Sequence, residues 1–169
     1  MSISPKFFLM ILLSMALYAC GGGESESSSD SASNESSQPS VAPVAELSIE
    51  GNDQMKYNKD RMEVFAGQKV KLTLTHVGKL PVESMGHNWV LLKQGTDLTE
   101  FGNAAATAAD NGYIPAGMEG RVITHTKMIG GGEEVTIEFE APAPGTYDFM
   151  CTFPGHYAFM KGKFVVSEV

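Results

Sequence analysis

A thiol, an imidazole and a thioether lie close together in one short segment near the C-terminus. The segment CTFPGHYAFM, residues 151–160, places Cys151, His156 and Met160 at spacings of five and four residues. Because a Pro-Gly pair turns the chain inside it, a loop of this length can bring all three side chains to one point. A soft thiolate, an imidazole and a distant thioether suit copper in a trigonal site with a weak axial sulfur. The segment therefore predicts a copper site, the alternative being a buried cysteine packed against a histidine.

Such a site needs a second imidazole, and three other histidines are available: His76, His87 and His125. His87 is the best candidate because it follows Gly86 at the start of an expected strand. A glycine there would let its backbone carbonyl approach the metal from the side opposite Met160. His76 shares the apolar face of its strand, which favours a packed histidine, and His125 is expected at the surface.

Short strands are the elements that must position these residues. Alternating apolar and polar residues predict strands most clearly at 69–76 and 134–140. Six shorter segments complete a set of eight strands: 46–51, 61–65, 87–93, 121–127, 146–151 and 161–166. The Ala-rich segment 96–110 predicts a helical insertion, although Gly102 and Asn103 within it disfavour a helix. Eight short strands predict an all-β fold, an antiparallel sandwich or barrel.

The N-terminal segment is typical of an export signal. Lys6 precedes a short apolar run, which is shorter than the roughly 20 residues of a membrane-spanning helix. The run ends in LYAC, which resembles the bacterial lipobox and predicts lipidation of Cys20 after removal of residues 1–19. The alternative is ordinary secretion with a spare cysteine. Residues 20–45 are rich in Ser, Gly and Glu and predict a disordered tether, and residues 46–169 form the folded domain.

Composition excludes several classes of protein. Among 169 residues, 20 acidic side chains outnumber 12 basic ones, for a net charge of −8. That charge repels phosphate backbones and argues against nucleic-acid binding. Cys20 and Cys151 are the two cysteines of the chain, and the first lies in the targeting segment. The folded part therefore has neither a disulfide scaffold nor a four-cysteine zinc site.

Four segments of the chain resemble those of the azurins, the bacterial blue-copper proteins of the cupredoxin family. They are MGHNWVL, RVITHTKMIGGGE, CTFPGHYAFMKG and IEGNDQMKYN. The resemblance covers essentially all of residues 46–169, and lipid-modified, membrane-anchored azurins have the same arrangement of lipobox, linker and domain. It implies a Greek-key sandwich that holds one type 1 copper. Azurins also carry a disulfide near their first strands, and the corresponding positions here are Leu47 and Gly67.

The resemblance also assigns roles to individual residues. The implied copper ligands are two imidazoles, one thiolate and two weak axial groups: His87, His156, Cys151, Met160 and the Gly86 carbonyl. Asn88 and the backbone N–H of Phe153 correspond to groups that steady the cysteine sulfur. An uncharged apolar ring for partner docking is implied around the exposed ligand, comprising Leu80, Pro81, Met85, Phe153, Pro154 and Ala158.

These features predict an electron carrier rather than an enzyme, because such a ligand set leaves no open position for a substrate. The expected protein is lipid-anchored in the cell envelope, in the outer membrane facing the periplasm or the cell surface. It would pass single electrons by transient docking with c-type cytochromes, or with copper or haem reductases and peroxidases. Two alternatives are a copper-sequestering or copper-delivery lipoprotein with the same ligands, and a thiol enzyme that uses Cys151 with His156 as base.

Overall fold

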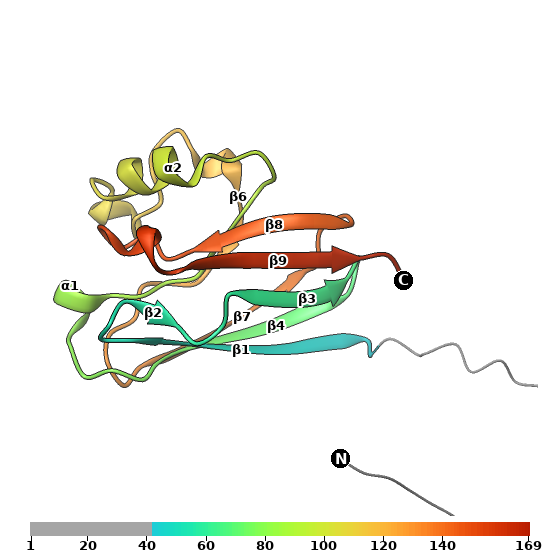
Figure 1. Ribbon diagram of the computed structural model, residues 1–169, viewed down its shortest axis with the longest axis horizontal. Coiled ribbons are helices and arrows are strands. Elements are labelled where there is room, and N and C mark those ends of the chain that lie inside the picture. Colours follow the sequence, from blue (N-terminus) through green and yellow to red (C-terminus); the bar gives the residue numbers. More distant parts are fainter. Residues whose placement is uncertain (1–41) are drawn as a thin grey trace, which may run out of the picture. The chain divides into compact units, whose positions relative to one another are not determined.

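The computed structural model describes residues 42–169, and this part of the chain forms a two-layered β-sandwich of nine strands (Figure 1). The strands are β1 (Val44–Asn52), β2 (Lys56–Tyr57), β3 (Arg61–Phe65), β4 (Lys69–His76), β5 (Val90–Leu92), β6 (Val122–His125), β7 (Glu134–Glu140), β8 (Gly145–Met150) and β9 (Lys161–Ser167). The helical elements are α1 (Val82–Met85), α2 (Leu98–Ala105) and the 3₁₀ turns η1 (Ala109–Asn111), η2 (Glu119–Arg121) and η3 (His156–Ala158). The eight expected strands are all present. The very short β2 and α1 were not expected.

The two sheets mix parallel and antiparallel neighbours. One sheet has the order β2-β1-β4-β7 and the other has the order β3-β9-β8-β5-β6. β1 runs parallel to β4, and β3 runs parallel to β9, whereas the remaining pairs are antiparallel. The expected all-β sandwich is therefore confirmed, but its strand pairing is not purely antiparallel. β1 and β4 are parallel because the chain crosses to the other sheet at β3 and returns at β4 in the direction of β1.

The core lies between the two sheets. In β4, Val70, Leu72 and Leu74 are buried and alternate with partly exposed polar residues, as its alternating sequence predicts. From the other sheet Phe149 and Phe164 pack around Trp89, with ring centroids 5.6 and 6.0 Å from it. Each such fully buried side chain contributes about 1.5–3 kcal/mol of hydrophobic stabilisation. This core fixes the strands whose ends carry the site.

The strand register corrects the expected position of the missing family disulfide. Leu47 lies opposite Leu72 in the parallel β1–β4 pair, well along β4 from Gly67. A disulfide needs two Cα atoms within about 7 Å. Leu47 and Gly67 are therefore not two facing positions, and Leu47 instead packs against the core.

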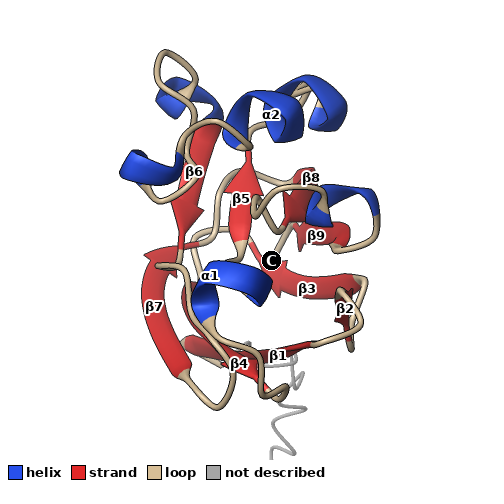
Figure 2. Ribbon diagram, turned by 90° about the vertical axis from the view of Figure 1, so that its left-hand side faces the viewer, coloured by secondary structure: helices blue, strands red, loops and turns tan. Residues whose placement is uncertain are grey.

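The expected helical insertion is present and begins at a side-chain cap. Oδ1 of Asp97 accepts hydrogen bonds from the N–H groups of Thr99 and Glu100, both at 2.8 Å, which satisfies the free donors of the first turn of α2. Phe101 and Ala105 are buried on the inner face of the helix. Figure 2 shows α2 beyond the ends of β5 and β6, outside the two sheets. The insertion thus adds a second, smaller core beside the sandwich.

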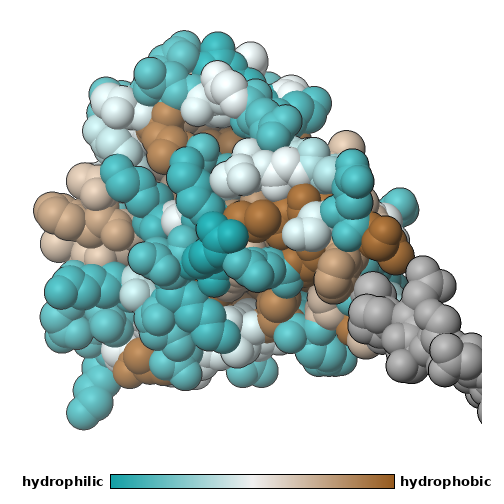
Figure 3. Space-filling model, turned by 45° about the vertical axis from the view of Figure 1, so that its right-hand side comes forward, coloured by the Kyte–Doolittle hydropathy of each residue, from teal (hydrophilic) through white to brown (hydrophobic). Residues whose placement is uncertain are grey.

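The sandwich has two distinct ends. Both described chain ends leave it at the right of Figure 1, whereas α1 and η3 lie at the left. Exposed apolar side chains occur at the first end, including Val44 and Phe65, and Figure 3 turns this end forward to show apolar surface interrupted by hydrophilic residues. No helix within residues 42–169 combines the length and hydrophobicity needed to cross a bilayer. The predicted signal peptide, Cys20 and the tether up to residue 41 lie outside the described residues.

Candidate metal centre

Three side chains that commonly bind metals converge at the end of the sandwich that carries α1 and η3. The ligand atoms of His87, Cys151 and His156 all lie within 4.8 Å of one another, and the three residues are buried. His87 lies between α1 and β5, Cys151 directly follows β8, and His156 opens η3. The structure therefore brings together the three residues that the family resemblance implies as the main copper ligands.

Cys151 lies at the centre of this group and is fully buried. Its Sγ is 3.6 Å from Nδ1 of His156 and 3.8 Å from the carbonyl oxygen of Gly86. Its backbone N–H donates to the carbonyl of Met160 at 2.9 Å, which closes the loop that joins β8 to β9. The Met160 side chain is also fully buried and packs in the same small cluster as Cys151. All five expected ligand groups thus belong to one compact neighbourhood.

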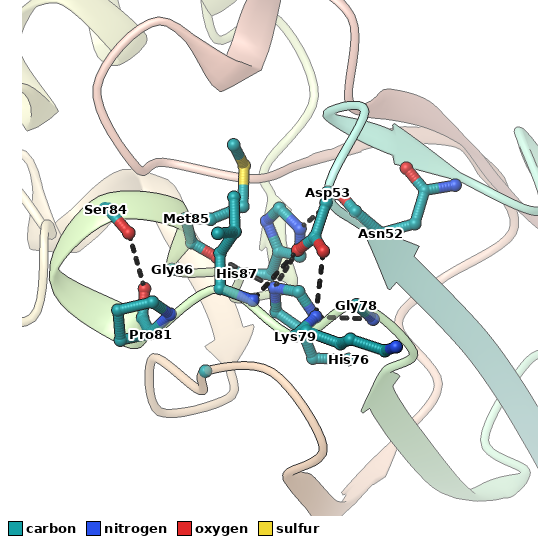
Figure 4. Close-up of polar contacts among 12 residues, drawn as sticks. Asn52, Asp53, His76, Gly78, Lys79, Pro81, Ser84, Met85, Gly86 and His87 are labelled. Atoms are coloured by element: carbon teal, nitrogen blue, oxygen red, sulfur yellow. Dashed lines mark hydrogen bonds and ion pairs between the residues drawn. The ribbon is translucent and has the colours of Figure 1, made fainter.

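The orientation of His87 is fixed by the backbone of another strand. Its Nε2 donates to the carbonyl of Asn52 at 2.9 Å, and its ring stacks on that of His76 with centroids 4.2 Å apart (Figure 4). Its Nδ1 is buried and has no hydrogen-bond partner among the described residues. A buried nitrogen without a partner is costly unless a cation or donor meets it. This nitrogen therefore fits a metal ion, because the backbone bond on Nε2 selects the tautomer that leaves Nδ1 free as a ligand.

A polar network behind His87 joins two loops. The Asp53 carboxylate accepts hydrogen bonds from the backbone N–H groups of Lys79 (2.8 Å) and Leu80 (3.3 Å), and Figure 4 shows this network around His76. The Lys79 N–H is the main reason that the pKa of Asp53 lies below its usual value. Nε2 of His76 donates to the carbonyl of Met85 at 2.8 Å. The connection from β4 to α1 is thereby fastened to the turn that carries Asn52.

Gly51 is a site residue that sequence reasoning missed. A Cβ at this position would lie 2.6 Å from Cδ2 of His87 and 3.3 Å from Cε of Met160. Those distances leave no room for a side chain, so β1 can pass this close to the site only with glycine. A glycine inside an expected strand was the available signal, since it often marks a close backbone approach.

Asn88 links the segment before β5 to the segment that follows β8 and contains Cys151. Its side-chain amide donates to Oγ1 of Thr152 at 2.8 Å, and its Oδ1 accepts from the Thr152 N–H at 2.9 Å. The Tyr57 hydroxyl donates to the Asn88 carbonyl, and the ring of Tyr57 packs against the cluster that contains Cys151. Tyr57 was also missed, because it lies in a two-residue strand with no alternation to reveal it. Asn88 thus holds Thr152, the residue that directly follows Cys151.

The protonation of the three central groups follows from their burial. Burial raises the pKa of the Cys151 thiol to about 11, opposed by the N–H groups of Asn88 and Phe153 and by the Tyr57 hydroxyl. Burial, followed by the charges of the neighbouring histidines, lowers the pKa of His156 to about 4. Burial likewise lowers the pKa of His87. At neutral pH both imidazoles are therefore neutral, and a metal ion that binds here displaces the thiol proton.

The expected docking residues differ in exposure. Leu80, Pro81, Pro154 and Ala158 are exposed, Met85 is half-buried and Phe153 is buried. Phe153 therefore belongs mainly to the interior of the site, where its ring lies 4.7 Å from that of His156 between centroids. A large apolar residue that was not predicted, Phe159, is 68% exposed on the same turn.

The fold and this centre together identify the class of protein. A sequence model described as copper-binding proteins of the plastocyanin/azurin family matches residues 43–167. The chain belongs to this family, its fold is that of an all-β cupredoxin sandwich, and its cofactor is copper. Two imidazoles and a thiol whose ligand atoms lie within 4.8 Å of one another are a donor set that suits copper, so the residues present fit the metal of the family.

Individual relatives sharpen this assignment. The chain is 42% identical to azurin of Bordetella pertussis over 130 residues, which cover 75% of this chain and 86% of that protein. It is 40% identical to the outer membrane protein H.8 of Neisseria meningitidis serogroup B over 123 residues, which cover 71% of this chain and 66% of the relative. Among solved structures, the blue copper protein auracyanin A of Chloroflexus aurantiacus superposes with a TM-score of 0.66 at 32% identity, covering 73% of this chain and 99% of that protein.

Proposed function

We propose that the protein is a carrier of single electrons whose copper is bound by His87, Cys151 and His156, with Met160 and the Gly86 carbonyl as weak axial contacts. The observation that carries the proposal is the buried cluster of two neutral imidazoles and one thiol within 4.8 Å. A soft sulfur with two nitrogens and a distant thioether is the donor set of blue-copper electron-transfer sites. The family membership and the auracyanin A neighbour support the same reading.

Copper, when bound, supplies a one-electron couple between its cuprous and cupric states. The chain's own contribution is to keep the ligands still. His87 is held by the Asn52 carbonyl, and the Cys151 backbone is held by Met160 across the β8–β9 loop. Because five groups already surround the metal position, no space is left for a substrate, which argues against an enzyme.

The electron leaves or enters through the turn that carries His156. This turn has exposed apolar residues, including Pro154 and Ala158, beside the buried His156, and the connection from β4 to α1 adds the exposed Leu80 at the same end of the sandwich. A small uncharged surface favours short encounters with interfaces below about 1,200 Å². The partners we propose are c-type cytochromes, or copper or haem reductases and peroxidases, which would meet the protein at this face.

The direct test is the visible and electron paramagnetic resonance spectrum of the protein with cupric ion. We expect an intense thiolate-to-copper absorption and a small copper hyperfine splitting. In Cys151→Ser the absorption should be lost completely, because no sulfur anion remains to supply it. A matched control is Ser167→Ala at the far end of β9, which should keep the colour. A colourless wild-type protein after loading under non-reducing conditions would refute the proposal.

Rates of electron exchange and of metal release distinguish an electron carrier from a copper-storage or copper-delivery protein. An electron carrier should reduce or oxidise a c-type cytochrome rapidly and should release its metal to chelators slowly, because its thiolate and ligands are buried. A copper-delivery protein with the same ligands would show the opposite behaviour. Slow exchange with every cytochrome tested, combined with rapid metal loss, would replace the first function by the second.

We further propose that the domain is anchored in the outer membrane through lipid on Cys20. The lipobox-like LYAC sequence supports this, and so does the similarity to a protein named for its outer-membrane location. Labelled fatty acid should be incorporated into the wild-type chain and not into Cys20→Ala, which should appear in the soluble envelope fraction. Equal labelling of the two chains would exclude Cys20 as the lipidation site.

A further inference from the structure

One residue, Tyr157, joins the ligand turn to helix α2. It directly follows His156 in η3, and its hydroxyl donates a hydrogen bond to Oδ1 of Asn103 at 2.8 Å. Its ring lies against Gly102 on the same helix. Tyr157 also packs against the small apolar core beneath α2. The helical insertion and the ligand turn are thus connected by packing and by a hydrogen bond at one point.

The residues of α2 that meet Tyr157 include Gly102 and Asn103, the two that disfavour a helix. A Cβ at position 102 would lie 2.5 Å from both Cγ and Cδ1 of the Tyr157 ring, so the ring occupies the space that any other residue would need. Glycine in a helix interior is less favourable than alanine by about 1 kcal/mol, and asparagine is also a poor helix former. The stability that α2 loses at Gly102 and Asn103 is therefore tied to its contact with the ligand turn.

The turn beyond His156 is closed by two backbone hydrogen bonds next to Tyr157. The His156 carbonyl accepts hydrogen bonds from the N–H groups of Phe159 (2.9 Å) and Met160 (2.8 Å). The turn is entered through Gly155 in a left-handed conformation, with φ of 80°. Pro154, Gly155 and Ala158 are exposed. Fixing Tyr157 consequently fixes the backbone that carries the His156 imidazole.

We propose that Tyr157 is a positioning residue that locks the His156 turn onto α2, and that Gly102 and Asn103 form its receiving surface. The importance of the lock for electron transfer rests on the proposed function, in which His156 is a copper ligand. A turn that is held from outside keeps His156 in place without a strong hydrogen bond of its own. The helical insertion then acts as a support for the metal centre, in addition to covering the sandwich.

The first test uses the copper-free protein and needs no electron transfer. Tyr157→Phe keeps the ring and removes only the hydroxyl, whereas Gly102→Ala displaces the ring. Amide hydrogen exchange followed by NMR should be roughly threefold to tenfold faster at Phe159 and Met160 in Tyr157→Phe, as expected for one lost hydrogen bond. The increase should be larger in Gly102→Ala. Amides in the β1–β4 pair should exchange at the wild-type rate in both variants.

A matched control is Tyr147→Phe, which also loses one hydroxyl bond, to the Ala143 carbonyl at 2.7 Å, at the start of β8 and away from the turn. It should leave the Phe159 and Met160 amides unchanged. Combining Tyr157→Phe with Asn103→Ala should add nothing to the exchange rates of the single variants, because each removes the same bond.

A second readout is the copper-loaded spectrum. The thiolate-to-copper absorption maximum and the copper hyperfine splitting should shift in Tyr157→Phe and Gly102→Ala and stay fixed in Tyr147→Phe. The proposed role of Tyr157 is refuted if Tyr157→Phe and Gly102→Ala both keep wild-type exchange at Phe159 and Met160. It is also refuted if Tyr147→Phe accelerates the exchange of these amides equally. Failure of the proposed function would appear separately, as a colourless wild-type protein whose amide exchange still decides whether Tyr157 holds the turn.

Discussion

The two imidazoles of the metal centre are held in opposite ways. His87 is buried and is fixed by the backbone carbonyl of Asn52 at the end of β1 and by stacking on His76 at the end of β4. His156 lies on a short turn whose neighbours are exposed and which Tyr157 ties to the helical insertion. The difference indicates a division of roles. In the proposed site, His87 would anchor the metal and His156 would connect it to the surface where a partner can approach.

The largest effect is expected from a substitution at Gly51, which lies against His87. In Gly51→Val the new side chain would overlap the His87 ring, whose Cδ2 is 2.6 Å from the Cβ position. Overpacking of this kind typically lowers the free energy of unfolding by up to about 3 kcal/mol. Denaturant unfolding of the copper-free protein measures it, with Gly120→Ala as a control because no atom lies within 4 Å of that Cβ position. A wild-type midpoint in Gly51→Val would contradict the tight approach of β1.

Acid should destabilise the copper-free protein through protonation of His156. The pKa of His156 is lowered from 6.5 to about 4 in the folded chain, so the unfolded state binds more protons between these values. The free energy of unfolding of the copper-free protein should therefore fall as the pH decreases from 6.5 towards 4, by about 2 kcal/mol for this one group.

Denaturant titrations between pH 7 and pH 4.5 measure this slope. Replacing His156 by Gln should flatten it, and by more than the same change at His87, whose pKa is lowered without reaching so large a shift. A slope that stays the same in His156→Gln would show that other groups cause the acid sensitivity.

The smallest effect is expected from removing the hydrogen bond between the Tyr57 hydroxyl and the Asn88 carbonyl. Tyr57→Phe removes the donor to the Asn88 carbonyl and one of the groups that lower the pKa of Cys151. Losing one hydrogen bond should reduce the free energy of unfolding by about 1 kcal/mol. The thiol should also react with an alkylating agent more slowly at pH 9 in the copper-free variant, because its pKa rises further. An alkylation rate equal to or above that of wild type would separate Tyr57 from the sulfur.

Alternation in the sequence was sufficient to predict most of the sandwich. The strands at 61–65, 69–76 and 134–140 have the predicted bounds, because each alternates a more exposed face with a more buried one along its whole length. The parallel pairing of β1 with β4 was not predictable in this way, since alternation specifies faces and not neighbours. The two-residue β2 is too short to show any period.

The residues of the metal centre were likewise predictable only in part. Cys151, His156 and Met160 were recognisable because their spacing within one loop is a property of the sequence itself. Gly51 and Tyr57 act across strands that are far from that loop in sequence, so only the folded chain shows what they contact. The roles of the five proposed copper ligands stay a prediction until a metal-loaded spectrum is measured.

The length of β1 has a consequence for how the protein meets its surroundings. This nine-residue strand begins near the entry of the described chain and ends beside His87, a span of roughly 25–30 Å at about 3.3 Å per residue. β9 starts next to Met160 and carries the C-terminus back in the other direction. The described chain therefore enters the domain at the end opposite the turn that carries His156. In the proposed function, a redox partner would dock at that turn, away from the point where residue 42 enters the domain.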